Sequence, residues 1–294
     1  MKLQVLHRTH FKYGQPVRDS FNEARLQPTE DHRQLPQSFL LKVLPSTRLS
    51  HYRDFYQNYV HRFELGEAHP DLTVTATSVV TTRNGLALAN DAPTAPISAL
   101  ASTATDSRCY DFLQSSQHVE TSAEAWRLAL DLAGDETDTW QLAQRLMHAI
   151  FRDFQYQPDS THIHTTTQEI LRNRQGVCQD FAHVMLSLCR STKIPARYVS
   201  GYLYNGPADS LKGAQASHAW VEVYVPAHGW IGLDPTNGQQ VDGRYVKIGV
   251  GRDYGDVTPL KGTYRGTTER KMSVNVLVTM LDEHAEPKPL KPAS

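Results

Sequence analysis

The chain has 294 residues, a length that predicts about two domains and allows a sizeable hydrophobic core. Its 30 Lys and Arg residues balance 31 Asp and Glu residues, and this near-neutral charge argues against nucleic acid or an anionic membrane as a partner. No stretch approaches the roughly 18 consecutive apolar residues of a membrane helix, and the first eight residues lack the apolar core of a signal peptide. We therefore expect a cytoplasmic protein.

The first hundred residues are expected to form β-strands. Polar and apolar residues alternate there at the two-residue period of a half-buried strand, and shorter apolar runs end at prolines and glycines. Two prolines among small residues then interrupt every pattern at 90–96, the best linker candidate. An N-terminal antiparallel β domain is therefore expected over residues 1–100. The runs with strand character are 3–13, 38–44, 56–65 and 72–80.

Beyond residue 100 apolar residues recur at helical spacing, first within 126–154. Thr166 and Glu169 fit a capping box for a short helix that should end near Gly176, and another helix is expected from Cys178 towards Pro195. The fold class expected is therefore α+β, with a second domain and a proline-rich disordered tail. Their ranges are 101–285 and 286–294, and further strands are expected at 197–204, 219–225, 230–233 and 273–280.

The three cysteines, Cys109, Cys178 and Cys189, are an odd number without a CxxC pair. This pattern argues against a disulfide framework and against a zinc ribbon. On one helix, Cys178 and Cys189 would lie about 16 Å apart, which is too far for a disulfide. We expect neither a metal ion nor a cofactor.

Cys178 is the candidate nucleophile because it stands where a helix should begin. The positive end of a helix dipole favours a thiolate, and the free N–H groups of the first turn can stabilise an oxyanion. Gly176, two residues earlier, allows a close approach of the chain. Taken alone, a cysteine at a helix start is more often a small buried side chain, so the assignment depends on its partners.

His218 opens an expected strand on which its side chain shares a face with Trp220. The next strand ends at Asp234. A three-residue loop at 226–228 would set Asp234 opposite Trp220, one diagonal step from His218. The carboxylate can then hold the imidazole in the tautomer that takes a proton from Cys178.

Other histidines are weaker candidates for the base. On a helix, His183 would lie about 140° around from Cys178, so we expect it to have a structural role. His162 and His164 could suggest a metal site, yet no Cys or Glu stands at ligand spacing in their Thr-rich segment. A solvated loop is the expected structure there.

The segments around these residues resemble the bacterial transglutaminase-like proteins, a family within the wider group of papain-like cysteine enzymes. The order Cys, His, Asp matches that of the family, and residues 54–58 resemble the added N-terminal β domain of its bacterial branch, although glycine often stands where this chain has Gln57. The other matching segments are 176–183 (GVCQDFAH), 190–202 (RSTKIPARYVSGY), 218–222 (HAWVE), 229–237 (GWIGLDPTN) and 251–262 (GRDYGDVTPLKG).

The resemblance implies a papain-like or transglutaminase-like core, in which a nucleophile helix packs on an antiparallel sheet. It also implies Cys178 as the nucleophile, His218 as the general base and Asp234 as its orienting partner, the same three residues that the chemistry favours. Tyr156 precedes the nucleophile and could lend its hydroxyl to the oxyanion, or it could belong to the core.

The expected reaction is attack of the thiolate on an amide carbonyl to form an acyl-enzyme. Transfer of the acyl group to water makes a peptidase or amidase, whereas transfer to an amine makes a transglutaminase. Hydrolysis of a peptide or protein amide is favoured, because the sequence shows neither a calcium-loop motif nor a feature for binding two protein substrates. A protein-glutamine acyltransferase and a non-catalytic binding module are the alternatives, and the sequence specifies no oligomeric state.

Overall fold

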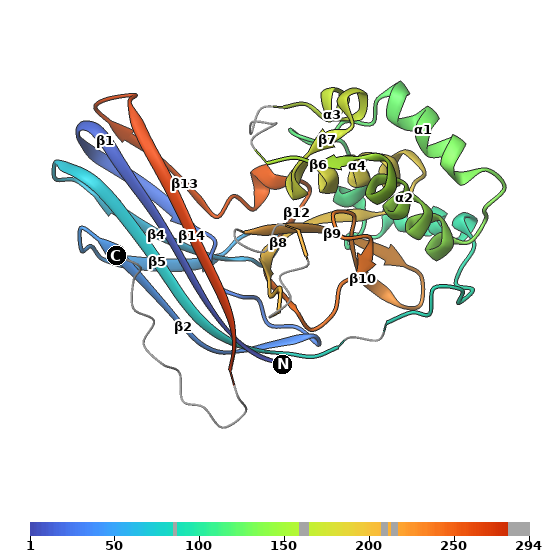
Figure 1. The fold of residues 1–294 in the computed structure, drawn as a ribbon, viewed down its shortest axis with the longest axis horizontal. Helices are drawn as coiled ribbons and strands as arrows, with labels where there is room; N and C mark the ends of the chain where they lie inside the picture. Colours follow the sequence, from blue (N-terminus) through green and yellow to red (C-terminus); the bar gives the residue numbers. More distant parts are fainter. Residues whose placement is uncertain (85–86, 159–164, 207–210, 213–216, 282–294) are drawn as a thin grey trace.

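The computed structural model describes residues 1–84, 87–158, 165–206, 211–212 and 217–281. Figure 1 shows two parts side by side, one made of long strands and the other of helices lying on a shorter sheet. No helix within these described ranges is long and apolar enough to cross a membrane. The proline-rich tail and the pair His162 and His164 lie outside the described residues.

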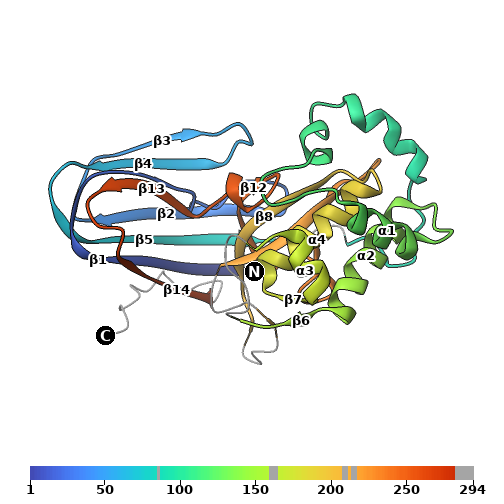
Figure 2. The ribbon, with the colours of Figure 1, turned by 90° about the horizontal axis from the view of Figure 1, so that it is seen from above.

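The first part is built around one long strand, β1 (Lys2–Ala24). Residues 2–12 of β1 pair with β5 on one side and with β14 on the other, whereas residues 18–24 pair with β4 and β13. The strand therefore belongs to two layers, ordered β2-β5-β1-β14 and β3-β4-β1-β13, which Figure 2 shows from above. The partner strands are β2 (Gln34–Leu44), β3 (Leu49–Arg53), β4 (Tyr59–Leu65), β5 (His69–Thr82), β13 (Leu260–Arg265) and β14 (Arg270–Leu281).

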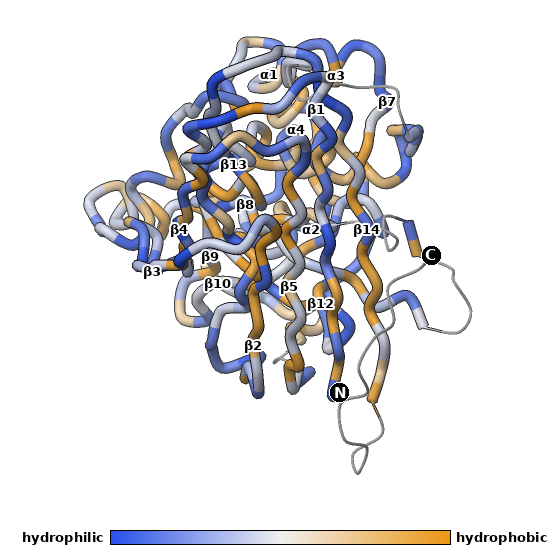
Figure 3. Tube along the Cα trace, turned by 90° about the vertical axis from the view of Figure 1, so that its left-hand side faces the viewer, coloured by the Kyte–Doolittle hydropathy of each residue, from blue (hydrophilic) through white to orange (hydrophobic). Residues whose placement is uncertain are grey.

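The two-residue period of these strands accounts for the packing of the two layers. Alternate side chains point to one face, and apolar side chains of β1, β2, β4 and β5 on that face are buried between the layers. Figure 3 shows the layer β2-β5-β1-β14 with its strands running side by side. The buried cluster between the layers includes Phe11, Val17, Leu41, Phe63 and Val74.

Two strands from the end of the chain complete this β part. Residues 101–285 were expected to form the second domain, but β13 and β14 of that range pair with β1. Lys2 pairs with Leu281, and Ala24 pairs with Leu260. The strand pattern of 273–280 was predicted correctly; its partner was not, because pairing between distant segments leaves no local signal. The boundary near residue 100 itself stays a prediction.

The helices of the second part agree with the expected periodicity. Thr166 and Glu169 form the expected capping box, in which each side chain bonds to the backbone N–H of the other residue. The helix that follows ends before Gly176, because Arg174 takes a left-handed conformation at φ 50° and stops it. The helices are α1 (Ala123–Ala133), α2 (Thr139–Asp153), α3 (Thr167–Asn173) and α4 (Cys178–Ser191), with 3-10 turns η1 (Ile97–Thr105), η2 (Tyr110–Leu113) and η3 (Tyr254–Asp256).

Helix α4 packs against a sheet with the antiparallel order β11-β10-β9-β8-β12. Its apolar side chains, among them Phe181, Met185 and Leu188, meet Val221 and Val223 of β9 in the main core. This arrangement confirms the expected α+β fold with a helix on an antiparallel sheet. The strands are β8 (Ala196–Leu203), β9 (His218–Val225), β10 (Gly229–Asp234), β11 (Gln239–Gln240) and β12 (Tyr245–Gly251), and β6 (Gln155–Tyr156) pairs separately with β7 (Gln175–Gly176).

The two parts share a buried interface. Leu3 and Val80 of the β part pack against Tyr202, Val246 and Ile248 of β8 and β12. The fully buried Asn58 side chain, from the segment that resembles the bacterial branch, also joins the two parts: it donates to the carbonyl oxygen of Val250 and accepts from its N–H, both at 2.8 Å. The two parts are therefore joined by apolar and polar contacts.

Candidate active site

Cys178 is the first residue of α4, as expected from the sequence. The N–H group of Val177 donates to the Asp180 carboxylate at 2.8 Å, which fixes the entry of the chain into the helix. A Cβ atom at Gly176 would come within 2.8 Å of Asp180, so only glycine leaves room for this carboxylate. The Cys178 side chain therefore sits at the positive end of α4, beside first-turn N–H groups that have no partner within the helix.

The hairpin of β9 and β10 brings His218 and Asp234 together. Gly229 pairs with Val225 across the expected three-residue loop, and the register continues to Leu233 opposite Val221. Nε2 of His218 lies 2.8 Å from Oδ2 of Asp234, and both side chains are fully buried. The structure therefore has the side-chain contact that the loop length predicts.

Asp234 is held by several hydrogen-bond donors besides His218. Its Oδ2 atom accepts from the Tyr245 hydroxyl at 2.7 Å and from Nδ2 of Asn237 at 2.8 Å, while Oδ1 accepts from the N–H of Thr236 at 2.8 Å. Burial alone would raise the pKa of this carboxyl, but the charge of His218 and these donors outweigh it and lower the pKa. Asp234 is therefore ionised and fixed in orientation.

The electrostatics of His218 favour the imidazolium. Burial acts to lower its pKa, whereas the charge and hydrogen bond of Asp234, followed by the contribution of Cys178, raise the pKa to about 10. Nδ1, the ring nitrogen that Asp234 leaves free, is buried, and no nitrogen or oxygen atom of the described residues bonds to it. Cys178 contributes to the raised pKa, so its side chain lies close enough to the imidazole to interact with it.

Two aromatic residues enclose the imidazole ring. Trp220 stacks on it with the ring centroids 6.2 Å apart, and Tyr245 lies at 5.9 Å. Trp220 is expected from the strand pattern to share a face with His218, whereas no pattern in the sequence indicates Tyr245. Tyr245 begins β12, and the glycines at 249 and 251 of this strand interrupt the alternating pattern by which a strand is recognised in the sequence.

Tyr156 lies close to Cys178, the candidate nucleophile. It pairs with Gly176 between β6 and β7, just before α4, and its ring lies 6.3 Å from that of Phe181. Burial, with a further contribution from Cys178, raises the pKa of Tyr156 to about 12. The hydroxyl therefore stays protonated and able to donate at neutral pH, while its role as an oxyanion donor stays a prediction.

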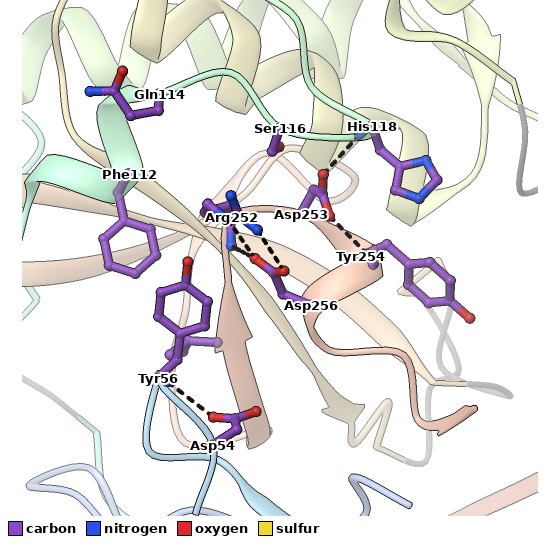
Figure 4. Close-up of polar contacts among 12 residues, drawn as sticks. Asp54, Tyr56, Phe112, Gln114, Ser116, His118, Arg252, Asp253, Tyr254 and Asp256 are labelled. Atoms are coloured by element: carbon purple, nitrogen blue, oxygen red, sulfur yellow. Dashed lines mark hydrogen bonds and ion pairs between the residues drawn. The ribbon is translucent and has the colours of Figure 1, made fainter. Parts of the chain in front are cut away.

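His183 has the structural surroundings expected of it. Its Nε2 atom accepts from the N–H of Tyr254 at 3.2 Å, its ring stacks on His118, and burial lowers its pKa to about 3. Figure 4 shows the neighbouring network, in which the Asp253 carboxylate accepts from the N–H of His118 at 2.8 Å and Arg252 pairs with Asp256. This neutral histidine anchors α4 to the segment after β12.

The other two cysteines lie apart from this chemistry. Cys109 and Cys189 are free thiols with no exposed surface, and burial raises their pKa values to about 11 and about 12. Among the described residues no group of three or more His, Cys, Asp or Glu side chains could hold a metal ion.

Comparison with known families gives two matches. A family described as the transglutaminase-like superfamily matches residues 127–235, and one described as the bacterial transglutaminase-like N-terminal region matches residues 3–81. The first range includes Cys178, His218 and Asp234. The second covers nearly all of β1 to β5.

Comparison with individual proteins gives relatives over the full length and over the core. An uncharacterized protein of Mycobacterium leprae is 34% identical over 283 residues, which are 95% of this chain and 99% of that protein. A protein-glutamine gamma-glutamyltransferase of Pseudomonas aeruginosa is 34% identical over 99 residues, 32% of this chain and 15% of that protein. The crystal structure of a candidate cysteine protease from Cytophaga hutchinsonii has a TM-score of 0.76 at 21% identity, covering 99% of this chain and 94% of that one, and shows the same fold.

Proposed function

The chain belongs to the transglutaminase-like superfamily, and we propose that it is a cysteine-dependent amide-processing enzyme that forms an acyl-enzyme on Cys178. The observation that carries the proposal is the contact of His218 with Asp234, which leaves Nδ1 of the imidazole for Cys178. A solely structural histidine would not need a buried carboxylate held by three further side-chain and backbone donors.

The residues divide the chemistry between them. His218 takes the thiol proton at Nδ1, and Sγ of Cys178 attacks the carbonyl carbon of the amide. The first-turn N–H groups of α4 stabilise the oxyanion of the tetrahedral intermediate. As the C–N bond breaks, the imidazolium gives its proton to the leaving amine. Water deprotonated by His218 then hydrolyses the thioester and restores the thiol.

Hydrolysis of a peptide or protein amide is the proposed outcome, so the enzyme would be a peptidase or amidase. The fold shared with a candidate cysteine protease over 99% of the chain is compatible with this outcome but shows the fold alone. The alternative acceptor is an amine, which would make the chain a protein-glutamine acyltransferase. The match over 99 residues to a protein-glutamine gamma-glutamyltransferase favours testing that alternative directly.

One experiment separates these outcomes. Glutamine peptides and peptide amides are incubated with the protein, with and without a labelled primary amine, and the products are identified by mass spectrometry. Release of acid without incorporation of the amine supports a hydrolase, and incorporation of the amine supports the acyltransferase. Cys178→Ala is the inactive control and Cys189→Ala the matched one, because Cys189 is buried away from the site. Turnover by Cys178→Ala would contradict both activities. If the wild type shows no turnover, the remaining alternative is a non-catalytic binding module.

A further inference from the structure

Residues 241–247 comprise the connection after β11 and the first three residues of β12, which begin with Tyr245; we call them the tyrosine segment. It lies beyond residues 127–235, which match the superfamily core. On one side its Tyr245 hydroxyl donates to Asp234 at 2.7 Å, and Nε2 of Gln239 donates to that hydroxyl at 2.8 Å. The orientation of the carboxylate therefore depends on where this segment is held.

The N-terminal β part holds the other side of the tyrosine segment by its backbone. Around Gly243, the Thr82 hydroxyl donates to the carbonyl oxygen, and Oδ1 of Asn84 accepts from the N–H at 3.0 Å. The Arg33 guanidinium donates to the carbonyl oxygen of Val241. At the end of the segment, Gln34 accepts from the Lys247 N–H at 2.8 Å and donates to its carbonyl oxygen at 2.7 Å.

These contacts come from the segments just before β2 and at the end of β5, and they require close packing. A Cβ atom at Gly243 would lie 2.8 Å from Oδ1 of Asn84, so a larger residue there would displace the amide. A cavity of about 20 Å³ lies beside the contacts, and Trp220 and Tyr245, the two aromatic residues that enclose His218, form part of its wall together with Gln34 and Arg83 of the β part. The β part thus faces the back of the candidate site.

We propose that Tyr245 is a positioning residue for Asp234 and His218, and that the N-terminal β part, through Thr82 and Asn84, holds Tyr245 in place. This inference rests on the proposed function. It gives the β part a role in the chemistry without any contact between that part and the substrate. The route has three steps: the β part holds the tyrosine segment, Tyr245 orients Asp234, and Asp234 sets the position and charge of His218.

The test measures the rate of Cys178 alkylation by iodoacetamide as a function of pH, which requires no knowledge of the substrate. The variants are Thr82→Val, Asn84→Ala, Tyr245→Phe and the double variant Thr82→Val/Tyr245→Phe. Each single variant should alkylate about 3- to 10-fold more slowly at pH 6 to 7, because a misplaced imidazole stabilises the thiolate less. The rates should converge with the wild type above pH 9, where a thiol ionises without help.

The control is Asn58→Ala, which removes two other buried hydrogen bonds between the two parts, both to Val250 in the same strand β12. It should lower the melting temperature but leave the alkylation rate unchanged. The double variant should be no slower than Tyr245→Phe alone, because both changes act through one hydroxyl.

The inference is overturned if Thr82→Val and Asn84→Ala alkylate like the wild type, or if Thr82→Val keeps its full effect in the Tyr245→Phe background. Its failure differs from failure of the proposed function. If Cys178→Ala abolishes turnover while alkylation is insensitive to Thr82, only the role of the β part is wrong. If Cys178→Ala retains turnover, the proposed function is wrong.

Discussion

Oδ2 of Asp234 lies 2.8 Å from Nε2 of His218, and this contact decides which ring nitrogen is available for chemistry. A carboxylate acceptor keeps the proton on Nε2, so in the neutral ring Nδ1 is the basic nitrogen. Cys178 contributes to the raised pKa of His218, and Nδ1 is the nitrogen that the proposed function assigns to it. The pair therefore fixes both the direction and the charge of the imidazole.

Replacing this carboxylate by an amide should remove most of the activity. We expect Asp234→Asn to lower kcat by about 10²- to 10⁴-fold, because an amide neither fixes the tautomer nor stabilises the imidazolium. The pKa of His218 should fall from about 10. NMR titration of the imidazole proton and steady-state kinetics measure the two effects. Asp153→Asn is the control, since that carboxylate pairs with Arg152 outside the site, and unchanged kcat in Asp234→Asn would contradict the assignment.

The same pair should make stability depend on pH. The folded pKa of His218, about 10, is above its ordinary value of 6.5, so the stabilisation is complete below pH 6.5 and is lost as the pH rises towards 10. The buried His7 and His183 have lowered pKa values, about 4 and about 3, so they make stability depend on pH below pH 7 and not above it. The urea midpoint of the wild type should therefore fall between pH 7.5 and 8.5.

The Asp234→Asn variant is the comparison for this measurement. It should lose less stability over the same pH interval, because its imidazole gains less from folding. A wild-type midpoint that rises with pH, or a fall of equal size in the variant, would show that His218 is not the group responsible.

Thiol labelling should distinguish the three cysteines. At pH 7.5 iodoacetamide should modify Cys178 alone, because burial raises the pKa of Cys109 to about 11 and that of Cys189 to about 12 and keeps both as thiols. Intact-mass spectrometry should find one adduct on the folded wild type and none on Cys178→Ala. Three adducts are expected in urea. A second rapid adduct on the folded protein would contradict the burial of Cys109 and Cys189.

Tyr156→Phe tests the second oxyanion donor. If the hydroxyl stabilises the oxyanion, kcat should fall by about 10²-fold with little change in KM, because the bond is formed only in the transition state. The raised pKa of Tyr156, about 12, means that this loss should not vary between pH 6 and 9. Tyr224→Phe, in the second half of β9, is the matched control. Equal kcat values for the wild type and Tyr156→Phe would assign Tyr156 to the core.

Much of the site could be predicted from the sequence because its determinants are local. The loop at 226–228 sets the register of a hairpin, and a one-residue change would have turned Asp234 to the other face. The pairing of β13 and β14 with β1 joins residues more than 230 positions apart, as Lys261 with Glu23, and no period in either segment encodes its partner. Tyr245 was not predicted because the glycines of β12 hide its strand period, and because sheet geometry, not spacing along the chain, brings its hydroxyl to Asp234.

Gln57 stands where the bacterial branch often has glycine, and this difference gives a prediction about stability. Gln57 has a positive φ of 65°, a conformation that glycine adopts without the steric penalty of a Cβ atom. The Asp54 carboxylate accepts from the N–H groups of Tyr56 and Asn58 at 3.0 and 2.9 Å and holds the turn without using the Gln57 side chain. Figure 4 shows the Asp54 and Tyr56 side of this turn.

Gln57→Gly should therefore stabilise the fold by about 0.5 to 1 kcal/mol, which is the steric gain minus the extra freedom of glycine in the unfolded chain. Gln57→Ala is the matched control, because it removes the side chain beyond the Cβ atom but keeps that atom, and it should give no gain. Urea denaturation of the three proteins measures the difference. Equal gains in both variants would mean that the glutamine side chain, and not the left-handed backbone, destabilises the turn. The turn affects the stability of the whole protein because it lies next to the buried contact of Asn58 with Val250.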